Sequence, residues 1–197
     1  MTMNLLVFLT HPEVVIDPQV PVPQWRLSDR GIARMRMFTE ATAGIRWQAI
    51  FCSDERKARD GAQIVAGSAG LEPVVARDLA ENDRSATGYL DKVAFEAHAD
   101  RFFAHPRESI GGWERAVDAQ TRIVGAVMRI DREAPASGNI LVVAHGGVGA
   151  LLLAHLSDRP ISRALDQPGG GGGNLLTLRR NPLALVHGWR AIEDLIA

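Results

Sequence analysis

The sequence predicts a three-layer α/β/α sandwich with a central, mostly parallel sheet and one antiparallel edge. Short apolar runs alternate with segments whose apolar residues recur at helical spacing, a pattern typical of α/β domains. The last two apolar runs are separated only by Arg-Arg-Asn-Pro at 179–182, which is typical of a hairpin. Because strands joined by a hairpin are antiparallel, this pair predicts the antiparallel edge.

Six segments are expected to be strands because they are short, apolar runs bounded by turn-forming residues. They cover residues 5–9, 49–52, 74–77, 140–144, 175–178 and 184–187. Helices are expected after Ser28, a suitable N-cap, after Ser53, and after His145. Two further helices are expected over about 90–103 and 112–132.

Two stretches interrupt this alternation. Residues 17–23 contain three prolines, so we expect them to run extended across the surface. Residues 169–173 are five glycines followed by Asn174 and a strand, whereas a phosphate-cradling glycine loop leads into a helix. We therefore expect a mobile loop near the mouth of a site.

Composition is that of a soluble enzyme. The chain has 197 residues, 46% of them hydrophobic, with a formal net charge of −1 and one cysteine. We expect a single domain over 1–197 with a helical insertion around 82–112. The charge disfavours a general nucleic-acid binder, and no apolar run is long enough for a membrane span or a signal peptide. We expect a cytoplasmic protein with no nucleic-acid or membrane partner, and a homodimer is compatible with the sequence.

Two histidines directly follow predicted strands. His11 follows the first apolar run, and His145 follows the fourth and precedes two glycines. Ligands bind in open α/β sheets at the carboxyl ends of the strands. Two strands that each deliver an imidazole to that edge can build a reaction centre, whereas the other four histidines are expected to be surface or packing residues. A zinc site of both histidines and Glu81 is not expected, because no His-x-x-x-His pair or cysteine accompanies them.

Four fragments in order resemble the histidine phosphatase superfamily, which has the phosphoglycerate mutase-like fold. Residues 25–31 are similar to its Leu-Thr-x-x-Gly segment, 51–58 to its Ser-Ser-x-x-x-Arg-Ala segment and 79–81 to its Leu-x-Glu. Residues 142–147, Val-Val-Ala-His-Gly-Gly, are close to its Val-Val-Ser-His-Gly-Gly. The resemblance covers nearly the whole chain and implies metal-independent phosphoryl transfer through a phosphohistidine, without any cofactor.

The resemblance also implies residue roles. His11 would be the nucleophile, His145 would stabilise the transferring group, and Glu81 would be the general acid and base, with Asp83 as the second choice. Lys57 occupies the place of a family arginine and would join them as a catalytic cation. The residues expected to bind substrate are Thr10, Ser53, Arg56, Arg26, Gly146 and Asn174.

The sequence departs from the family at the first strand. Thr10-His11-Pro12 stands where the family has Arg-His-Gly. A threonine hydroxyl offers one neutral donor in place of a charged, forked guanidinium, and proline lacks an N–H. Losing a hydrogen bond to a charged group costs about 1.5–3 kcal/mol, so both the threonine and Lys57 weaken the expected grip on phosphate.

Three interpretations follow from this departure. A different cation, chosen from Arg26, Arg56, Arg59 and Arg84, could complete a competent phosphatase. The pocket could instead suit a different substrate, or the chain could be a catalytically impaired phosphate- or protein-binding member of the fold. We favour a phosphatase acting on a small phosphomonoester or a phosphohistidine protein. A mutase is less expected, because it must retain a bisphosphate.

Overall fold

The computed structural model describes residues 4–196 and has six strands in one mixed sheet. The strands are β1 (Leu5–Thr10), β2 (Trp47–Cys52), β3 (Val74–Val75), β4 (Asn139–Ala144), β5 (Asn174–Arg179) and β6 (Ala184–Ala191). Their order is β3-β2-β4-β1-β5-β6. The pairs among β1 to β4 are parallel, while β1–β5 and β5–β6 are antiparallel. The predicted fold class is therefore confirmed, with two antiparallel strands at one edge.

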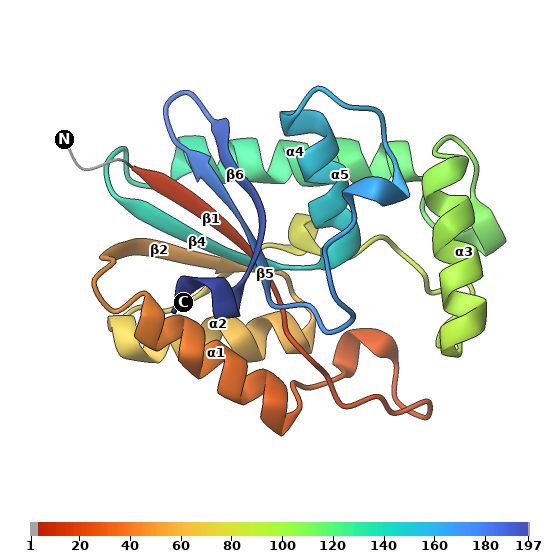
Figure 1. Ribbon diagram of the computed structural model, residues 1–197, viewed down its shortest axis with the longest axis horizontal. Helices are drawn as coiled ribbons and strands as arrows, with labels where there is room; N and C mark the ends of the chain where they lie inside the picture. Colours follow the sequence, from red (N-terminus) through yellow and green to blue (C-terminus); the bar gives the residue numbers. More distant parts are fainter. Residues whose placement is uncertain (1–3, 197) are drawn as a thin grey trace.

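Five α-helices accompany the sheet (Figure 1). They are α1 (Asp29–Ala41), α2 (Arg56–Ala69), α3 (Lys92–Ala104), α4 (Ala116–Glu133) and α5 (Gly146–Leu156). The first two cover one face of the sheet, where Met35 and Val65 are buried, and α4 and α5 cover the other with Ile123 and Leu151. The helix α3 lies to one side of these layers (Figure 1). None of the described helices is long and apolar enough to cross a membrane.

Short 3-10 helices fill several connections. They are η1 (Val22–Gln24), η2 (Arg77–Leu79), η3 (Ile110–Gly112), η4 (Arg163–Leu165) and η5 (Ile192–Leu195). The expected strand at 74–77 is only two residues long, because the chain turns into η2 to bury Leu79. The helix expected from 112 begins four residues later, since Gly111 and Gly112 adopt positive φ angles outside the helical region.

Local sequence accounts for the starts of two helices. The Ser28 side chain accepts a hydrogen bond from Gly31 N at the beginning of α1, as predicted. The Asp91 side chain does the same for Ala94 N at the beginning of α3. By contrast, Glu55 stands at the N-cap of α2 without capping it, because its carboxylate turns inward.

Two loop expectations need correction. Residues 17–23 do not run extended, because they form turns and η1, and Trp25 Nε1 donates to the carbonyls of Asp17 and Val20. The second half of the glycine run is tied down rather than loose. Arg34 donates to the carbonyl oxygen of Gly172 at 2.9 Å, and a Cβ on Gly172 would collide with the carbonyl oxygen of His11.

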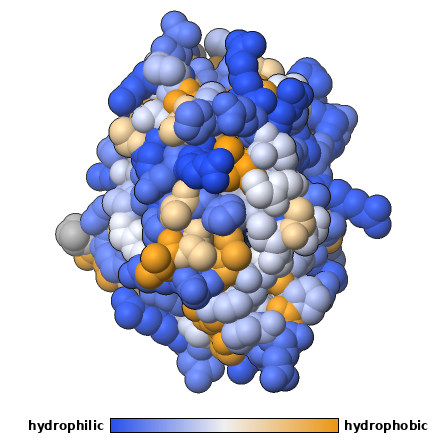
Figure 2. Space-filling view, turned by 90° about the vertical axis from the view of Figure 1, so that its right-hand side faces the viewer, coloured by the Kyte–Doolittle hydropathy of each residue, from blue (hydrophilic) through white to orange (hydrophobic). Residues whose placement is uncertain are grey.

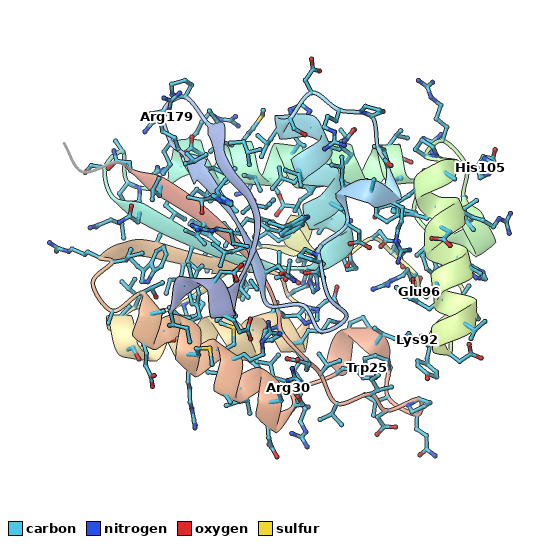
Figure 3. All side chains as sticks on the ribbon, viewed as in Figure 1. Trp25, Arg30, Lys92, Glu96, His105 and Arg179 are labelled. Atoms are coloured by element: carbon cyan, nitrogen blue, oxygen red, sulfur yellow. The ribbon has the colours of Figure 1, made fainter. Side chains whose placement is uncertain are left out.

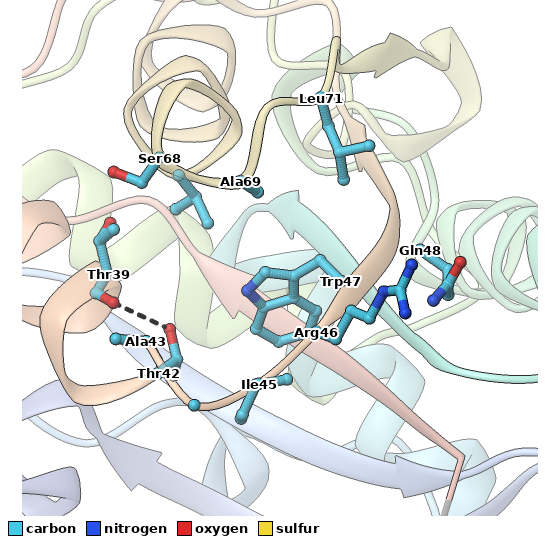
Figure 4. A pocket seen from close by; sticks show the side chains of 12 residues that line it. Thr39, Thr42, Ala43, Ile45, Arg46, Trp47, Gln48, Ser68, Ala69 and Leu71 are labelled. Carbon is cyan, nitrogen blue, oxygen red and sulfur yellow. Dashed lines mark hydrogen bonds between the residues drawn. The ribbon is translucent and has the colours of Figure 1, made fainter.

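A surface hollow of about 450 Å³ (Figure 4) lies at the end of the sheet where β2 begins. The two histidines lie at the other end, where β1 and β4 finish. The hollow is lined by Thr39, Thr42 and Leu71 and by Trp47, the first residue of β2. Since His11 and His145 follow the last residues of parallel strands, this hollow is not part of their site.

Candidate active site

The parallel pairing of β1 and β4 brings the two histidines together. Thr10 pairs with Ala144, so the next residue of each strand emerges at the same edge of the sheet. His11 N also donates to the carbonyl oxygen of Ala144 at 3.0 Å. The two imidazole rings lie edge to face, with 5.2 Å between centroids and 70° between planes.

The orientation of His11 is set by the proline that follows it. His11 Nδ1 lies 2.9 Å from the carbonyl oxygen of Pro12. Because a carbonyl can only accept, the ring proton is on Nδ1 and the lone pair of the neutral ring is on Nε2. Burial, together with the nearby His145 and Lys57, lowers the pKa of His11 to about 3. The imidazole is therefore uncharged at neutral pH.

His145 is completely buried behind His11. Its Nε2 lies 2.7 Å from Ser53 Oγ, and Ser53 Oγ accepts a hydrogen bond from Glu55 N at 3.1 Å. Ser53 Oγ at 2.7 Å and Glu55 Oε1 at 3.4 Å are the atoms that face His145 Nε2. His145 Nδ1 is buried without a partner among residues 4–196. Burial lowers the pKa of His145 as well.

Lys57 is brought to the site but its charge is already paired. Its Nζ lies 2.5 Å from Glu55 Oε2 and donates to the carbonyl oxygen of Val22 at 2.9 Å. The other oxygen, Glu55 Oε1, accepts from Glu81 N at 3.0 Å and lies 3.4 Å from His145 Nε2. Burial opposes ionisation of Glu55, but attraction to His145 and Lys57 and these hydrogen bonds lower the pKa of its carboxyl.

Glu81 caps the beginning of α5. Its Oε1 accepts from Asn82 N and Val148 N, and its Oε2 accepts from Gly147 N, at 3.0 to 3.1 Å. A Cβ on Gly147 would lie 2.7 Å from Glu81 Oε1, so glycine permits this approach. Only Oε2 keeps a free lone pair with which it could exchange a proton.

Thr10 and Asn174 do not present free donors to a substrate, contrary to the prediction. Thr10 Oγ1 donates to Gln167 Oε1 at 2.7 Å and accepts from Asn174 N at 3.0 Å. Asn174 Nδ2 donates to Gln167 Oε1 and to the carbonyls of Pro168 and Gly172. Both side chains instead hold the glycine run against the end of β1.

The four arginines considered as replacement cations differ in their exposure and in their contacts. Arg26, Arg56 and Arg59 are exposed, and no described contact joins them to either histidine. The guanidinium of Arg56 lies 4.0 Å from Asp60. Arg84 is half-buried over the rings of Phe95 at 5.2 Å and Trp113 at 5.6 Å, and its charge contributes to lowering the pKa of His145. Within residues 4–196 no carboxylate pairs with it.

Some residues near the site were not predicted. The predicted Ser53 and Gly146 adjoin His145, whereas Glu55, Gln167 and the carbonyl of Val22 were missed. Glu55 was visible in the sequence, within the fragment at 51–58 that resembles the family, but the inward turn of its side chain was not. The described residues contain no group of three or more His, Cys, Asp or Glu placed to hold a metal ion.

The outer face that carries α3 is mostly hydrophilic. Figure 2 shows hydrophobic side chains there in small groups among charged and polar ones. Val93 on α3 is 81% exposed, and the ring of Tyr89 packs against Trp25 with 5.7 Å between centroids. Figure 3 shows Trp25 and Lys92 on the same side of the molecule, where the segment before α1 approaches the α3 region.

Comparison with known proteins agrees with this arrangement. A sequence profile of the histidine phosphatase superfamily (branch 1) matches residues 18–178. A mycobacterial glucosyl-3-phosphoglycerate phosphatase in complex with inorganic phosphate is 23% identical, with a TM-score of 0.76 over 96% of this chain and 99% of that chain. Bacillus stearothermophilus YhfR is 20% identical, with a TM-score of 0.74 over 94% and 95% of the two chains.

A third structure is the putative alpha-ribazole-5'-P phosphatase from Escherichia coli, which is 20% identical, with a TM-score of 0.69 over 96% and 98% of the two chains. At these identities the structural likeness establishes the fold. None of the curated proteins compared with the chain matches it.

Proposed function

The chain belongs to the histidine phosphatase superfamily, and on this premise we propose that it is a metal-independent phosphatase whose nucleophile is His11. The single observation that carries the proposal is the hydrogen bond from His11 Nδ1 to the carbonyl oxygen of Pro12. It leaves the Nε2 lone pair of a neutral ring free for attack at phosphorus. The substrate class remains a small phosphomonoester or a phosphohistidine protein.

The reaction has two balanced steps. In the first, His11 Nε2 forms a bond to phosphorus while the bond from phosphorus to the ester oxygen breaks, and the leaving oxygen takes a proton. In the second, water attacks the phosphohistidine, the bond from nitrogen to phosphorus breaks, and the water gives up a proton. Glu81 Oε2, with its free lone pair, is the site proposed to supply and then accept that proton.

His145 and Arg84 are proposed to stabilise the charge of the transferring group. His145 Nδ1 lacks a partner within residues 4–196, so in the tautomer that carries its proton there it would donate to a phosphoryl oxygen once the covering side chains shift. Arg84 is a cation near His145 that has no carboxylate partner among residues 4–196. Stacking on the rings of Phe95 and Trp113 limits the motion of its guanidinium and so reduces the entropy lost when it binds an anion.

A second candidate function is a catalytically impaired phosphate- or protein-binding member of the fold. Three observations favour it: Thr10 replaces an arginine, Glu55 neutralises Lys57, and the ring of His145 is completely covered. Each reduces the electrostatic stabilisation that phosphoryl transfer requires.

The decisive experiment compares the wild-type chain with His11→Ala on an aryl phosphate and on a panel of metabolite phosphates. We expect the wild type to release phosphate and the variant to lose this activity. Brief reaction followed by denaturation should leave acid-labile, alkali-stable phosphate on the wild type only. Equal rates for the two proteins on every substrate would eliminate the phosphatase and leave the binding function.

A further inference from the structure

The polar network at the end of β1 favours one orientation of the Gln167 amide. The carbonyl oxygens of Pro168 and Gly172 can only accept, so the Asn174 atom that faces them is Nδ2. The same Nδ2 faces Gln167, so the Gln167 atom toward it is Oε1. Gln167 Nε2, the two-proton donor, must therefore point away from this network.

The opposite end of the amide reaches the second histidine. A Cβ on Gly146 would collide with Gln167 Nε2, so this nitrogen lies directly over the residue that follows His145. Its partner atom Oε1 is held by Thr10, the residue that precedes His11. The carboxamide therefore bridges the two strand ends that carry the histidine pair.

The Gln167 donor is also available. Among residues 4–196, Nε2 has no hydrogen-bond acceptor, and it is not one of the fully buried unpartnered atoms. His145 Nδ1 and Asn82 Nδ2 are also buried without partners among these residues. An N–H group that has no acceptor and lies against the residue that follows His145 is suited to a phosphoryl oxygen.

We propose that Gln167 Nε2 is a phosphoryl-binding donor that stands in for the arginine missing at Thr10, and that the site consequently prefers singly charged phosphoryl groups. The proposal rests on the phosphoryl site of the proposed function. An amide supplies a hydrogen bond but no charge, so it gives a dianion less advantage over a monoanion than an arginine would.

The charges around the site favour the same form of the ligand. The beginning of α2 contributes Glu55, which is paired with Lys57. The segment before α3 contributes Glu81 and Arg84, and the residue before Gln167 is Asp166, which is paired with Arg163 at 3.2 Å. These three carboxylates and three cations sum to no net positive charge that would favour a second negative charge on the ligand, although Arg84 has no carboxylate partner among them. The hydroxyl of a singly charged phosphoryl group could also donate to the free lone pair of Glu81 Oε2.

The histidines do not reverse this preference in mild acid. Burial lowers the pKa of both His11 and His145, so neither ring becomes a cation as the ligand takes up its proton. The second pKa of phosphate esters is near 6. Burial raises the pKa of Asp166, the residue before Gln167, so its protonation is the protein contribution that the sulfate probe below must exclude. Apart from that group, affinity should follow the protonation state of the ligand.

The test uses inorganic phosphate and sulfate as probes, measured by titration calorimetry on the full chain below and above the second pKa of phosphate. We expect wild-type protein to bind phosphate at least about tenfold more tightly on the acid side. Sulfate, a dianion at both pH values, should bind weakly and equally. If sulfate affinity rises in acid in parallel with phosphate affinity, a protein group controls binding and the preference is refuted.

Gln167→Glu keeps the Oε1 acceptor but replaces the donor with a carboxylate, so phosphate affinity should fall about tenfold to a hundredfold. Gln63→Glu makes the same change on an exposed site of α2 and should bind like the wild type. Wild-type affinity in Gln167→Glu would overturn the role of Gln167. If Gln167→Glu does not fold, Gln167→Met removes the donor without adding charge, so it should weaken phosphate binding by about tenfold, less than a carboxylate would.

Binding and turnover separate the two proposals. Phosphate binding that depends on Gln167, in a chain without turnover, would support this inference and reject the phosphatase. Turnover that depends on His11 and is unaffected by Gln167→Glu would do the reverse.

Discussion

A proline directly after His11 is compatible with the proposed chemistry because the carbonyl of that residue, rather than its N–H, orients the His11 ring. The sequence alone suggested that Pro12 weakens the grip on phosphate, since proline has no backbone N–H to donate. In the structure the acceptor is what matters, and proline retains it. Thr10 likewise serves the network behind the site instead of the ligand.

At the level of this residue, we expect acid to destabilise the protein through His11. The unfolded chain protonates His11 below about pH 6.5, whereas in the folded chain the pKa is about 3. The unfolded state therefore binds more protons between these values, and the free energy of unfolding falls as pH falls. Because the ring is partly exposed, we expect a loss of about 1–2 kcal/mol from this group between pH 7 and pH 5.

Urea denaturation at the two pH values measures this effect. His11→Gln should show a correspondingly smaller decline, whereas His187→Gln, on the exposed part of β6, should decline as the wild type does. An unchanged decline in His11→Gln would contradict the neutral state assigned to His11.

At the beginning of α2, the same buried ion pair contributes both to the candidate site and to the stability of the fold. Glu55 links Lys57 on one side to Glu81 N on the other, and Lys57 in turn holds η1 through the carbonyl of Val22. Both side chains are nearly inaccessible. A buried ion pair stabilises little in itself, but either partner left alone carries an uncompensated charge.

We expect Glu55→Leu to lower the free energy of unfolding by about 3–5 kcal/mol, because Lys57 remains buried and unpaired. The double variant Glu55→Leu/Lys57→Met should lose at least about 1 kcal/mol less than the sum of the single variants. Denaturant unfolding of all four proteins gives this coupling. The exposed pair of Arg115 and Asp118 is the matched control and should show much weaker coupling. Additive losses at Glu55 and Lys57 would show that the pair is not coupled.

In the whole molecule, a second buried ion pair joins the β5–β6 hairpin to the far end of α4. Arg180 Nε lies 2.6 Å from Asp131 Oδ1, and Arg180 also donates to the carbonyls of Asp131 and Gly138. The sequence suggested only a polar turn at this position. The neighbouring Arg179 does point outward at the end of the hairpin (Figure 3).

Arg180→Met should therefore reduce the free energy of unfolding by about 3–5 kcal/mol by leaving Asp131 unpaired. Since the pair lies away from the histidines, phosphate binding and any turnover should be unchanged at temperatures where the variant is folded. Thermal unfolding measures the first effect and calorimetry the second. Arg179→Met should leave both unchanged, and equal stability of the two variants would refute the structural role of Arg180.

Much of the fold could be predicted because it depends on patterns within single segments. The apolar runs gave all six strands, the Ser28 cap gave the start of α1, and the 179–182 turn gave the antiparallel pair. The segment at 17–23 was misjudged because its conformation depends on Trp25 Nε1 and Lys57, which approach it from other parts of the chain.

The sequence by itself determined the α/β architecture, the meeting of His11 and His145 at one sheet edge, and the loss of an arginine at Thr10. Only the tertiary structure decided the electrical character of that edge, because charge depends on which side chains approach one another. The fold pairs Lys57 with Glu55 and stacks Arg84 on the rings of Phe95 and Trp113 without a carboxylate partner among residues 4–196. It also places the Gln167 side-chain nitrogen against Gly146, the residue after His145, while a contact across 157 residues of chain holds its oxygen at Thr10.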